Sequence, residues 1–349
     1  MSADKAFDLL YSEFKQVSAA ALWIVDENIS SHMIPAAIPL ITAISNRLDI
    51  AQSLQQQGWN CSFNDYLLED LPGHHYQSIF LRIPKEKAQA HYIINQAQRL
   101  LTDGGSLYIS GLKQEGIKGF IERAGSLTSI PAEVWKADKQ TWAGKITFDG
   151  TTHSQLDDKS YRTFRQAPSD LHFTFWSKPG IFGWDKIDKG SELLIQHLKA
   201  LIAGNNDIDS ALDIGCGYGY LSLHTARLLG ISLTATDNNA AAVAACQTNF
   251  DHYKLDGKAI ADNCAGNINS RFPLVICNPP FHSGFGVEND LTDRFLASAA
   301  AHVTKQGTAI FVVNLHIPLE RKASRYFTLC ETPVISKHFK LVQLSQPLS

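Results

Sequence analysis

The chain has 349 residues, of which 44% are hydrophobic and 19% are charged, and its formal net charge is −3. This length accommodates two domains of ordinary size, and the composition is that of a soluble globular protein. The sequence contains no apolar run of about 18 residues and starts without an apolar signal segment, so we expect neither a membrane span nor a secretory signal. The net charge excludes a uniformly basic nucleic-acid binder and leaves only local basic patches.

The first 120 residues alternate between helical and extended patterns. We expect helices over 1–20, 44–57 and 85–101, and strands over 20–25, 61–66, 76–82 and 106–110. The strand at 20–25 is followed by Asp26-Glu27-Asn28, where a nucleotide-binding fold would place a glycine-rich loop. The first half therefore has the element order of such a fold without its ligand-binding loop.

The middle of the chain is mixed in character. Residues 124–175 combine prolines, tryptophans and polar breaks, with strands expected at 145–148 and 171–176. We place a linker within 150–175 and divide the chain into domains 1–165 and 166–349. A helix is expected over 190–202, after the segment Pro179-Gly180-Ile181-Phe182-Gly183-Trp184.

A glycine-rich turn then follows a short strand. The turn is Asp213-Ile214-Gly215-Cys216-Gly217-Tyr218-Gly219, and a helical pattern begins at residue 220. Glycine permits a positive φ and a close approach of the backbone to a ligand. The spacing differs from that of dinucleotide-binding loops, and no phosphate-binding Gly-Lys-Ser/Thr lies nearby. The turn therefore indicates a nucleoside ligand without phosphates.

Acidic residues end the next two strands. Asp237 ends the strand at 232–236, about 20 residues after the loop, which suits an acceptor for ribose hydroxyls. Asp262-Asn263 ends a third candidate strand, where the carboxylate is placed to accept from an adenine amino group. Together with the glycine turn, these residues predict an adenosine-containing ligand.

Asn278-Pro279-Pro280-Phe281-His282 follows the buried strand predicted at 272–277. The two prolines stiffen this turn and remove backbone donors. An amide oxygen, a backbone carbonyl and an aromatic face suit a planar ring that carries an NH2 group. Further elements are expected at 291–302 (helix) and at 308–314, 326–332 and 339–343 (strands).

With these motifs in this order, the sequence resembles the class I methyltransferases, and in particular the two-domain bacterial 16S ribosomal RNA guanine-N2 methyltransferases. The resemblance implies an α/β protein of two tandem Rossmann-like methyltransferase domains, of which the first is degenerate. It implies S-adenosyl-L-methionine as cofactor, 16S rRNA of the small ribosomal subunit as partner, and methylation of the exocyclic N2 amine of a guanine.

Roles for individual residues follow from this resemblance. Asn278, Pro279, Pro280 and Phe281 are expected to be catalytic, and Phe281, His282 and Phe182 to contact the substrate. The residues expected to bind the cofactor are Asp213, Gly215, Gly217, Gly219, Asp237, Asp262, Asn263 and Asn278. We expect a cytoplasmic monomer, and no metal site, because none of the six cysteines forms a Cys-x-x-Cys pair.

The two halves are similar in pattern, which indicates an internal duplication. Residues 100–120 align with 302–322 around a shared glycine, Gly105 or Gly307. Three alternatives remain open. They are a guanine-N2 methyltransferase of large-subunit rRNA, a DNA adenine or protein glutamine methyltransferase, and a non-catalytic RNA-binding or assembly protein. Phe281-His282 argues against the second, because those enzymes usually carry Tyr or Trp after the prolines.

Overall fold

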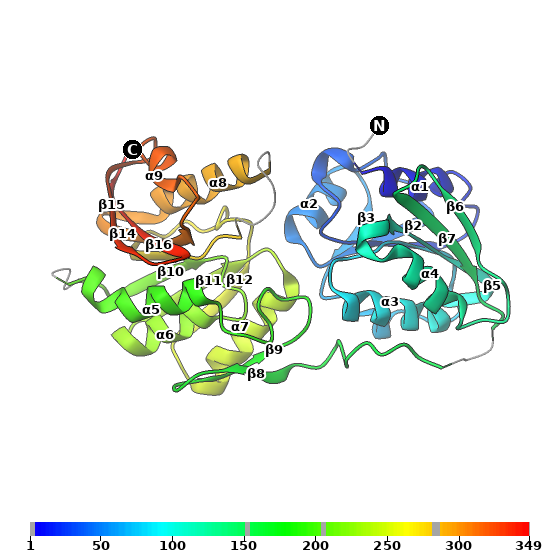
Figure 1. Cartoon of the computed structure of the whole chain (residues 1–349), viewed down its shortest axis with the longest axis horizontal. Coiled ribbons are helices and arrows are strands. Elements are labelled where there is room, and N and C mark those ends of the chain that lie inside the picture. Colours follow the sequence, from blue (N-terminus) through cyan, green and yellow to red (C-terminus); the bar gives the residue numbers. More distant parts are fainter. Residues whose placement is uncertain (1–3, 151–153, 204–206, 281–286, 349) are drawn as a thin grey trace. The chain divides into compact units, whose positions relative to one another are not determined.

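The computed structural model describes residues 4–150, 154–203, 207–280 and 287–348. The chain forms two compact units, residues 1–163 and 164–349. Each unit contains a seven-stranded sheet with helices on both faces (Figure 1). The α/β fold class predicted from the sequence is confirmed.

In the first unit the sheet order is β3-β2-β1-β4-β5-β7-β6, in which the pairs β5–β7 and β7–β6 are antiparallel and the other pairs are parallel. Helices α1 and α2 cover one face, and α3 and α4 cover the other. The elements are α1 (Lys5–Phe14), β1 (Ala21–Val25), β2 (Ile41–Ser45), α2 (Leu48–Gln56), β3 (Asn60–Phe63), β4 (Tyr76–Arg82), α3 (Lys87–Leu100), β5 (Leu101–Leu112), α4 (Ile117–Gly125), β6 (Glu133–Lys136) and β7 (Thr141–Thr147).

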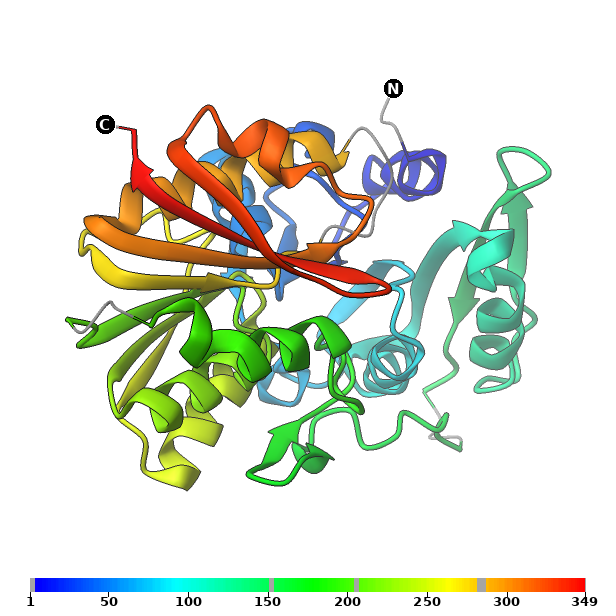
Figure 2. The ribbon, with the colours of Figure 1, turned by 60° about the vertical axis from the view of Figure 1, so that its left-hand side comes forward.

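The second unit has the corresponding order β12-β11-β10-β13-β14-β16-β15, preceded by a separate hairpin, β8–β9. The long antiparallel strands β15 and β16 form one edge of its sheet (Figure 2). The elements are β8 (Arg165–Ser169), β9 (Thr174–Ser177), α5 (Lys189–Leu201), β10 (Ser210–Ile214), α6 (Tyr220–Leu229), β11 (Ser232–Asp237), α7 (Ala240–Tyr253), β12 (Gly257–Ala261), β13 (Phe272–Cys277), α8 (Val287–His302), β14 (Val303–Asn314), α9 (Leu319–Ala323), β15 (Phe327–Ile335) and β16 (Phe339–Pro347).

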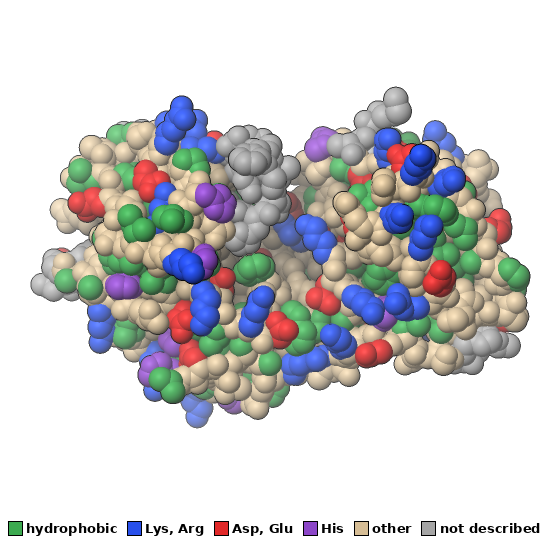
Figure 3. Space-filling view, viewed as in Figure 1, with side chains coloured by type: hydrophobic (Ala, Val, Ile, Leu, Met, Phe, Trp, Pro, Cys, Tyr) green, Lys and Arg blue, Asp and Glu red, His purple; other side chains and the backbone are tan. Residues whose placement is uncertain are grey.

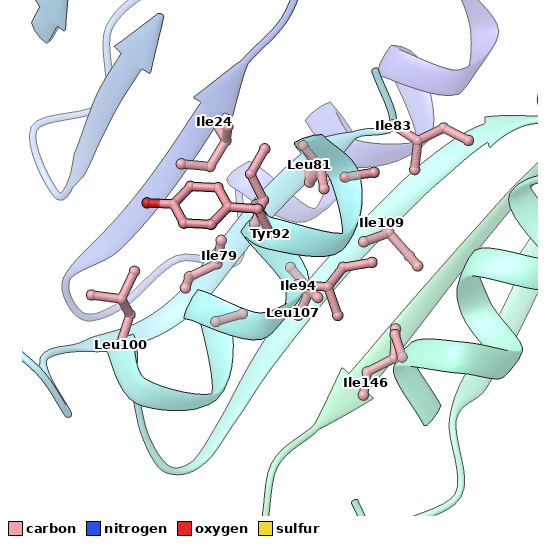
Figure 4. Close-up of a cluster of buried hydrophobic side chains, with 14 of the residues drawn as sticks. Ile24, Ile79, Leu81, Ile83, Tyr92, Ile94, Leu100, Leu107, Ile109 and Ile146 are labelled. Carbon is pink, nitrogen blue, oxygen red and sulfur yellow. The ribbon is translucent and has the colours of Figure 1, made fainter. Parts of the chain in front are cut away.

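Alternation along the strands divides each core into two layers. In β13, Leu274 and Ile276 pack with α5, α6 and α7, whereas Val275 and Cys277 pack with α8 and α9. In the first unit, Leu81 and Tyr92 belong to the corresponding layer beneath α3 and α4 (Figure 4). Every central strand is therefore buried on both faces, as expected of parallel sheets.

The register of the two sheets is the same, which supports the inferred duplication. Trp23 pairs with Phe80 across β1 and β4 as Asp213 pairs with Ile276 across β10 and β13. Gly105 lies just before the Ser78–Ser106 pair of β4 and β5, and Gly307 lies just before the equivalent Leu274–Thr308 pair of β13 and β14. The shared glycine marks equivalent places in the two repeats.

Two local predictions in the first half were wrong. The helix expected over 44–57 is split, because Ile41–Ser45 is strand β2 and the helix α2 begins at Leu48. The strand has only five residues and ends two residues before an amphipathic helix, so its pattern merges with the helical one. Gly104 and Gly105, expected to form a turn before a strand, lie within β5, where the register with β4 shifts.

The first repeat also lacks a helix. Between β1 and β2 it has only a short 3-10 helix (Ser31–Met33), where the second repeat has the glycine turn and α6. Trp23 lies on the face from which this helix is missing and packs against Phe7, Phe14 and Trp59, with ring centroids 5.1–5.4 Å apart. Aromatic side chains thus fill space in the layer that lacks the helix.

Candidate functional site at the carboxyl edge of the second sheet

The candidate residues of the second repeat gather at one edge of its sheet. Strands β10, β11, β12 and β13 run parallel, so the residues that follow them emerge side by side. The glycine turn follows β10, Asp262 follows β12, and Asn278 follows β13. Ligands of open α/β sheets bind at this edge.

The glycine turn has the backbone conformation that its sequence predicts. Gly215, Gly217 and Gly219 have φ values of +83°, +56° and +94°. Gly215 N donates to Thr236 O at 2.8 Å, and Gly217 N donates to the Asp237 Oδ2 atom at 3.0 Å. The turn is therefore tied to the end of β11, and Asp237 also accepts from Asn239 N through its other oxygen.

Asp213 is completely buried below the turn. Ser222 Oγ donates to Asp213 Oδ2 at 2.5 Å, and Oδ1 has no hydrogen-bond partner among the described residues. Burial raises the pKa of Asp213 to about 7. A buried carboxyl group with one unsatisfied oxygen is an energetic cost to the fold and is typical of binding sites.

We expect this cost to appear in the pH dependence of stability. The folded-state pKa of Asp213 lies above the value of about 3.9 in unfolded chains, so its stabilising contribution is present at low pH and lost as pH rises towards 7. Asp213→Asn should therefore stabilise the protein relative to wild type more at pH 8 than at pH 5, by a few kcal/mol in the free energy of unfolding. Thermal unfolding of both proteins at the two pH values measures this difference. Exposed Asp256→Asn is the control, and equal pH slopes for wild type and Asp213→Asn would contradict the assignment.

Asp262 has a similar environment to Asp213. Its side chain is 1% exposed, Oδ2 accepts from Asn267 N at 3.0 Å, and Oδ1 has no described partner. The Asp262 backbone N–H donates to Asp237 O at 2.9 Å, which fixes the two strand ends together. The neighbouring Asn263 side chain accepts a hydrogen bond from Arg294.

The side chain of Asn278 is hydrogen-bonded to the start of α5. Its Nδ2 atom donates to Asp188 Oδ2 at 2.7 Å and to Ser191 Oγ at 2.8 Å. Pro279 is buried and Pro280 is exposed. Phe281 and His282, which we predicted to contact the substrate, lie outside the described residues.

The two aromatic residues in the segment before α5 have different environments. Phe182, predicted to contact the substrate, is 62% exposed, whereas Trp184 packs partly against the core with the Arg165 guanidinium 5.1 Å from its ring centroid. Sequence reasoning missed Asp188 and Ser191 as parts of the site. The signal was present as an Asp at a helix N-cap with Ser three residues later.

The first repeat places different residues at the same edge. Counting along the matched strands, Val25 stands at the position of Gly215, Ser45 at that of Asp237 and Asn64 at that of Asp262. Tyr66 is fully buried, and its hydroxyl donates to Val25 O and to Asn46 Oδ1 at 2.9 and 3.0 Å. A tyrosine side chain of the chain itself thus reaches Val25, the residue equivalent to Gly215.

Arg82 closes the rest of this edge. It is 2% exposed and forms ion pairs with Asp4 at 3.0 Å and Glu115 at 2.6 Å. Asn28 Nδ2 donates to Ile83 O at 3.2 Å, which occupies a backbone carbonyl after β4. The polar groups at the edge of the first sheet are therefore paired with one another, and the repeat is degenerate as a ligand site.

The fold and the site together define a class I methyltransferase. Residues 172–343 match the model of the methyltransferase small domain, and residues 13–139 match that of the methyltransferase small domain N-terminal region. The chain belongs to this family of two-domain methyltransferases.

Curated relatives carry the name ribosomal RNA small subunit methyltransferase C. The chain is 29% identical over 270 residues to that of Erwinia tasmaniensis, covering 74% of this chain and 72% of the relative. It is 28% identical over 280 residues to that of Pseudomonas putida, covering 79% and 82%. A solved structure of the T. thermophilus 16S rRNA N2 methyltransferase (RsmC), in complex with AdoMet and guanosine, superposes with a TM-score of 0.85 at 21% identity, covering 99% of this chain and 92% of that one.

Two further observations bound the site. No group of three or more His, Cys, Asp or Glu side chains suited to a metal ion occurs among the residues that the structure describes. In the same part of the chain, no helix combines the length and apolar character needed to cross a bilayer.

Proposed function

We propose that this protein transfers a methyl group from S-adenosyl-L-methionine to the exocyclic N2 amine of a guanine in 16S rRNA of the small ribosomal subunit. One observation carries the proposal. A nucleoside-type glycine turn and the Asn278-Pro279-Pro280 turn follow two adjacent parallel strands, β10 and β13. The substrate class rests on the relatives, which carry the name of a small-subunit rRNA methyltransferase.

The residues at the edge of the second sheet fit the proposed cofactor. Gly215, Gly217 and Gly219 let the backbone approach it, and Asp237 stands where ribose hydroxyls are accepted in this fold. The unpartnered, buried Asp262 Oδ1 suits the adenine amino group, and the Asp213 carboxyl suits the cationic methionine end. Bound there, the cofactor supplies an electrophilic methyl group on a sulfonium.

The chain's own part in the reaction is to hold and activate the amine. The lone pair of the guanine N2 amine is conjugated with the ring, so the amine is a poor nucleophile. Hydrogen bonds from its two N–H groups to Asn278 Oδ1 and to the carbonyl of Pro279 favour a pyramidal nitrogen with a freer lone pair. The new C–N bond forms as the C–S bond breaks, sulfur takes the bonding pair, and the extra proton on nitrogen leaves to water.

Positioning accounts for much of the rate, because it replaces a bimolecular encounter by a fixed geometry. Phe281 is assigned to stacking on the base, a contact typically contributing about 1–3 kcal/mol, and His282 and Phe182 to further substrate contacts. A paired guanine would have to leave its helix first. We infer that the protein works as a monomer in the cytoplasm, where ribosomes are, because one chain carries both repeats.

The experiment that tests this function is tritiated methyl transfer to small subunits, large subunits and naked rRNA, followed by mapping of the modified nucleotide. We expect label at one guanine N2 of 16S rRNA. Label confined to large-subunit rRNA would favour the rival guanine-N2 enzyme. Cofactor binding without transfer to any RNA, or no cofactor binding at all, would favour a non-catalytic assembly role.

We further propose that residues 1–165 act mainly in substrate contact, whereas residues 166–349 carry catalysis. Residues 1–170 hold 16 Lys and Arg against 19 Asp and Glu, so any RNA contact must be local. Basic and acidic side chains are interspersed over the visible surface (Figure 3). Among the basic side chains near the end of the first unit, Arg162 is paired with Asp65 and Glu69.

The better candidate surface surrounds Trp142 on β7. Lys118 Nζ, from α4, lies 4.0 Å from the centroid of the Trp142 ring, and Lys136 Nζ, from β6, lies 5.5 Å from it. Two ammonium groups held beside an aromatic ring suit a phosphate next to an unpaired base. By contrast, Lys322 and Arg325 in the second unit both pair with Asp293.

We expect Lys118→Glu combined with Lys136→Glu to lower kcat/KM on ribosomal particles by about tenfold at low salt. Charge reversal removes two cations that attract phosphate, and the loss should shrink as salt rises. Thermal stability and cofactor affinity should stay unchanged. The matched control is exposed Lys15→Glu in the same unit. Unchanged kcat/KM in the double variant, with normal folding, would leave the first repeat a purely structural role.

A further inference from the structure

The amide of Asn278 is held by two acceptors at the start of helix α5. Asp188 is the N-cap of this helix, and its Oδ2 atom accepts from Ser191 N at 2.8 Å as well as from Asn278 Nδ2 at 2.7 Å. Ser191 Oγ accepts the second bond from Asn278 Nδ2 at 2.8 Å. Both hydrogens of the Asn278 amide are therefore used.

These contacts fix which way the amide points. A carboxylate has no hydrogen to donate, so the atom of Asn278 that faces Asp188 must be the nitrogen. The Asn278 Oδ1 atom is then directed away from α5, and no described residue donates a hydrogen bond to it. An amide with its nitrogen satisfied and its oxygen open presents one acceptor in one defined direction.

We propose that Asp188 and Ser191 are positioning residues, which orient Asn278 so that its oxygen meets the target amine and the opposite amide orientation is excluded. The inference rests on the proposed function, because the amine is that of the proposed substrate. The Asp188 carboxylate also polarises the Asn278 amide, which makes Oδ1 a stronger acceptor. Neither residue needs to touch the substrate.

The helix start leaves little room for another arrangement. A Cβ at Gly190 would lie 3.0 Å from Asp188 Oδ2 and 3.1 Å from side-chain atoms of Val312 and Phe339. The first turn of α5 is thus pressed against β14 and β16, and Ser191 is 6% exposed. The two acceptors are built into the packed fold, as a precise site requires.

The first repeat provides an internal comparison. Its helix α1 also starts with an aspartate N-cap, Asp4, and this carboxylate also contacts the end of the fourth strand, where it accepts from Arg82 Nε at 3.0 Å. The link from the helix cap to the strand end is thus present in both repeats. The guanidinium of Arg82 has no acceptor to offer an amine, whereas the Asn278 amide has one. The proposed catalytic repeat therefore differs from the first repeat in the residue that contacts the N-cap, Asn278 instead of Arg82, and not in the contact itself.

Three variants of the full-length chain test the proposal in single-turnover methylation of small subunits. Asp188→Ser keeps a good N-cap but is too short to hold Asn278, and Ser191→Ala removes the second acceptor. We expect the single-turnover rate to fall between about ten- and a hundredfold for Asp188→Ser and less for Ser191→Ala. Asp188→Asn should recover most of the rate, because its amide oxygen, fixed by Ser191 N–H, still accepts from Asn278. Affinities for cofactor and particles should change less than about threefold.

A purely structural role predicts a different pattern, in which thermal stability, cofactor affinity and rate fall together. That result would overturn the proposal, as would an unchanged rate in Asp188→Ser. A second readout is the side-chain amide resonance of Asn278 in asparagine-labelled protein. Its hydrogens should exchange slowly in wild type and rapidly in Asp188→Ser. If wild-type protein methylates no rRNA, the proposed function fails, while this resonance still decides whether Asp188 and Ser191 hold the amide.

Discussion

Replacement of Asn278 by alanine is expected to abolish methyl transfer while leaving cofactor affinity nearly unchanged. The side-chain oxygen that would accept from the target amine is lost, whereas Asp237, Asp262 and the glycine turn stay in place. Removing one preorganised hydrogen-bonding group of this kind typically costs about 10²–10³-fold in kcat. Single-turnover methylation and calorimetric titration with the cofactor measure the two quantities separately.

Two comparisons make this result specific. Asn60→Ala removes an exposed asparagine of the first unit and should leave both quantities unchanged. Asn278→Asp keeps an acceptor oxygen but has no hydrogen to donate to Asp188, so two carboxylates would face each other. We expect Asn278→Asp to be as inactive as the alanine variant. A tenfold loss of cofactor affinity in Asn278→Ala would show that cofactor binding, the other role expected of Asn278 from the sequence, is its main one.

The sequence alone predicted those parts of the fold whose signals are local. Strand β13 and the helix α5 have long, clear patterns, and the residues that follow β10, β11, β12 and β13 were correctly placed at strand ends. Strand β2 was missed because it has only five residues and ends two residues before an amphipathic helix. Pattern reasoning resolves such short elements poorly, because only Asn46 and Arg47 separate the strand from the helix.

The missing parts of the candidate site depend on contacts between distant residues. Asn278 and Asp188 are 90 positions apart, so no local spacing reveals that one orients the other. The same holds for the first repeat. Its sequence shows that the glycine loop is absent, but not that Tyr66 reaches Asn46 or that Arg82 pairs with Asp4 and Glu115. Such contacts arise from tertiary packing, which strand and helix periodicity does not encode.

The two glycines at the ends of α6 allow a matched test of the cofactor loop. Both Gly219, before the helix, and Gly230, after it, have positive φ, at +94° and +66°. A Cβ at Gly219 would lie 2.8 Å from Cys246 Sγ and 2.9 Å from Leu223 Cδ1, whereas a Cβ at Gly230 has no heavy atom within 4 Å. An alanine at either position would therefore be strained by the positive φ, but only an alanine at Gly219 would also collide with neighbouring side chains.

We expect Gly219→Ala to weaken cofactor binding by at least tenfold and Gly230→Ala to leave it unchanged. Each alanine costs about 1–2 kcal/mol for the left-handed conformation, so both variants should unfold at lower temperature. Only Gly219→Ala must also displace the turn from α7, because Cys246 belongs to that helix. Titration with S-adenosyl-L-methionine, in which wild type should bind one equivalent per chain, measures the affinity. Equal losses in the two variants would mean that strain at the ends of α6, rather than the shape of the turn, controls binding. If wild type instead bound two equivalents and Gly219→Ala still bound one, the remaining site would lie in the first repeat, where Tyr66 and Arg82 now stand.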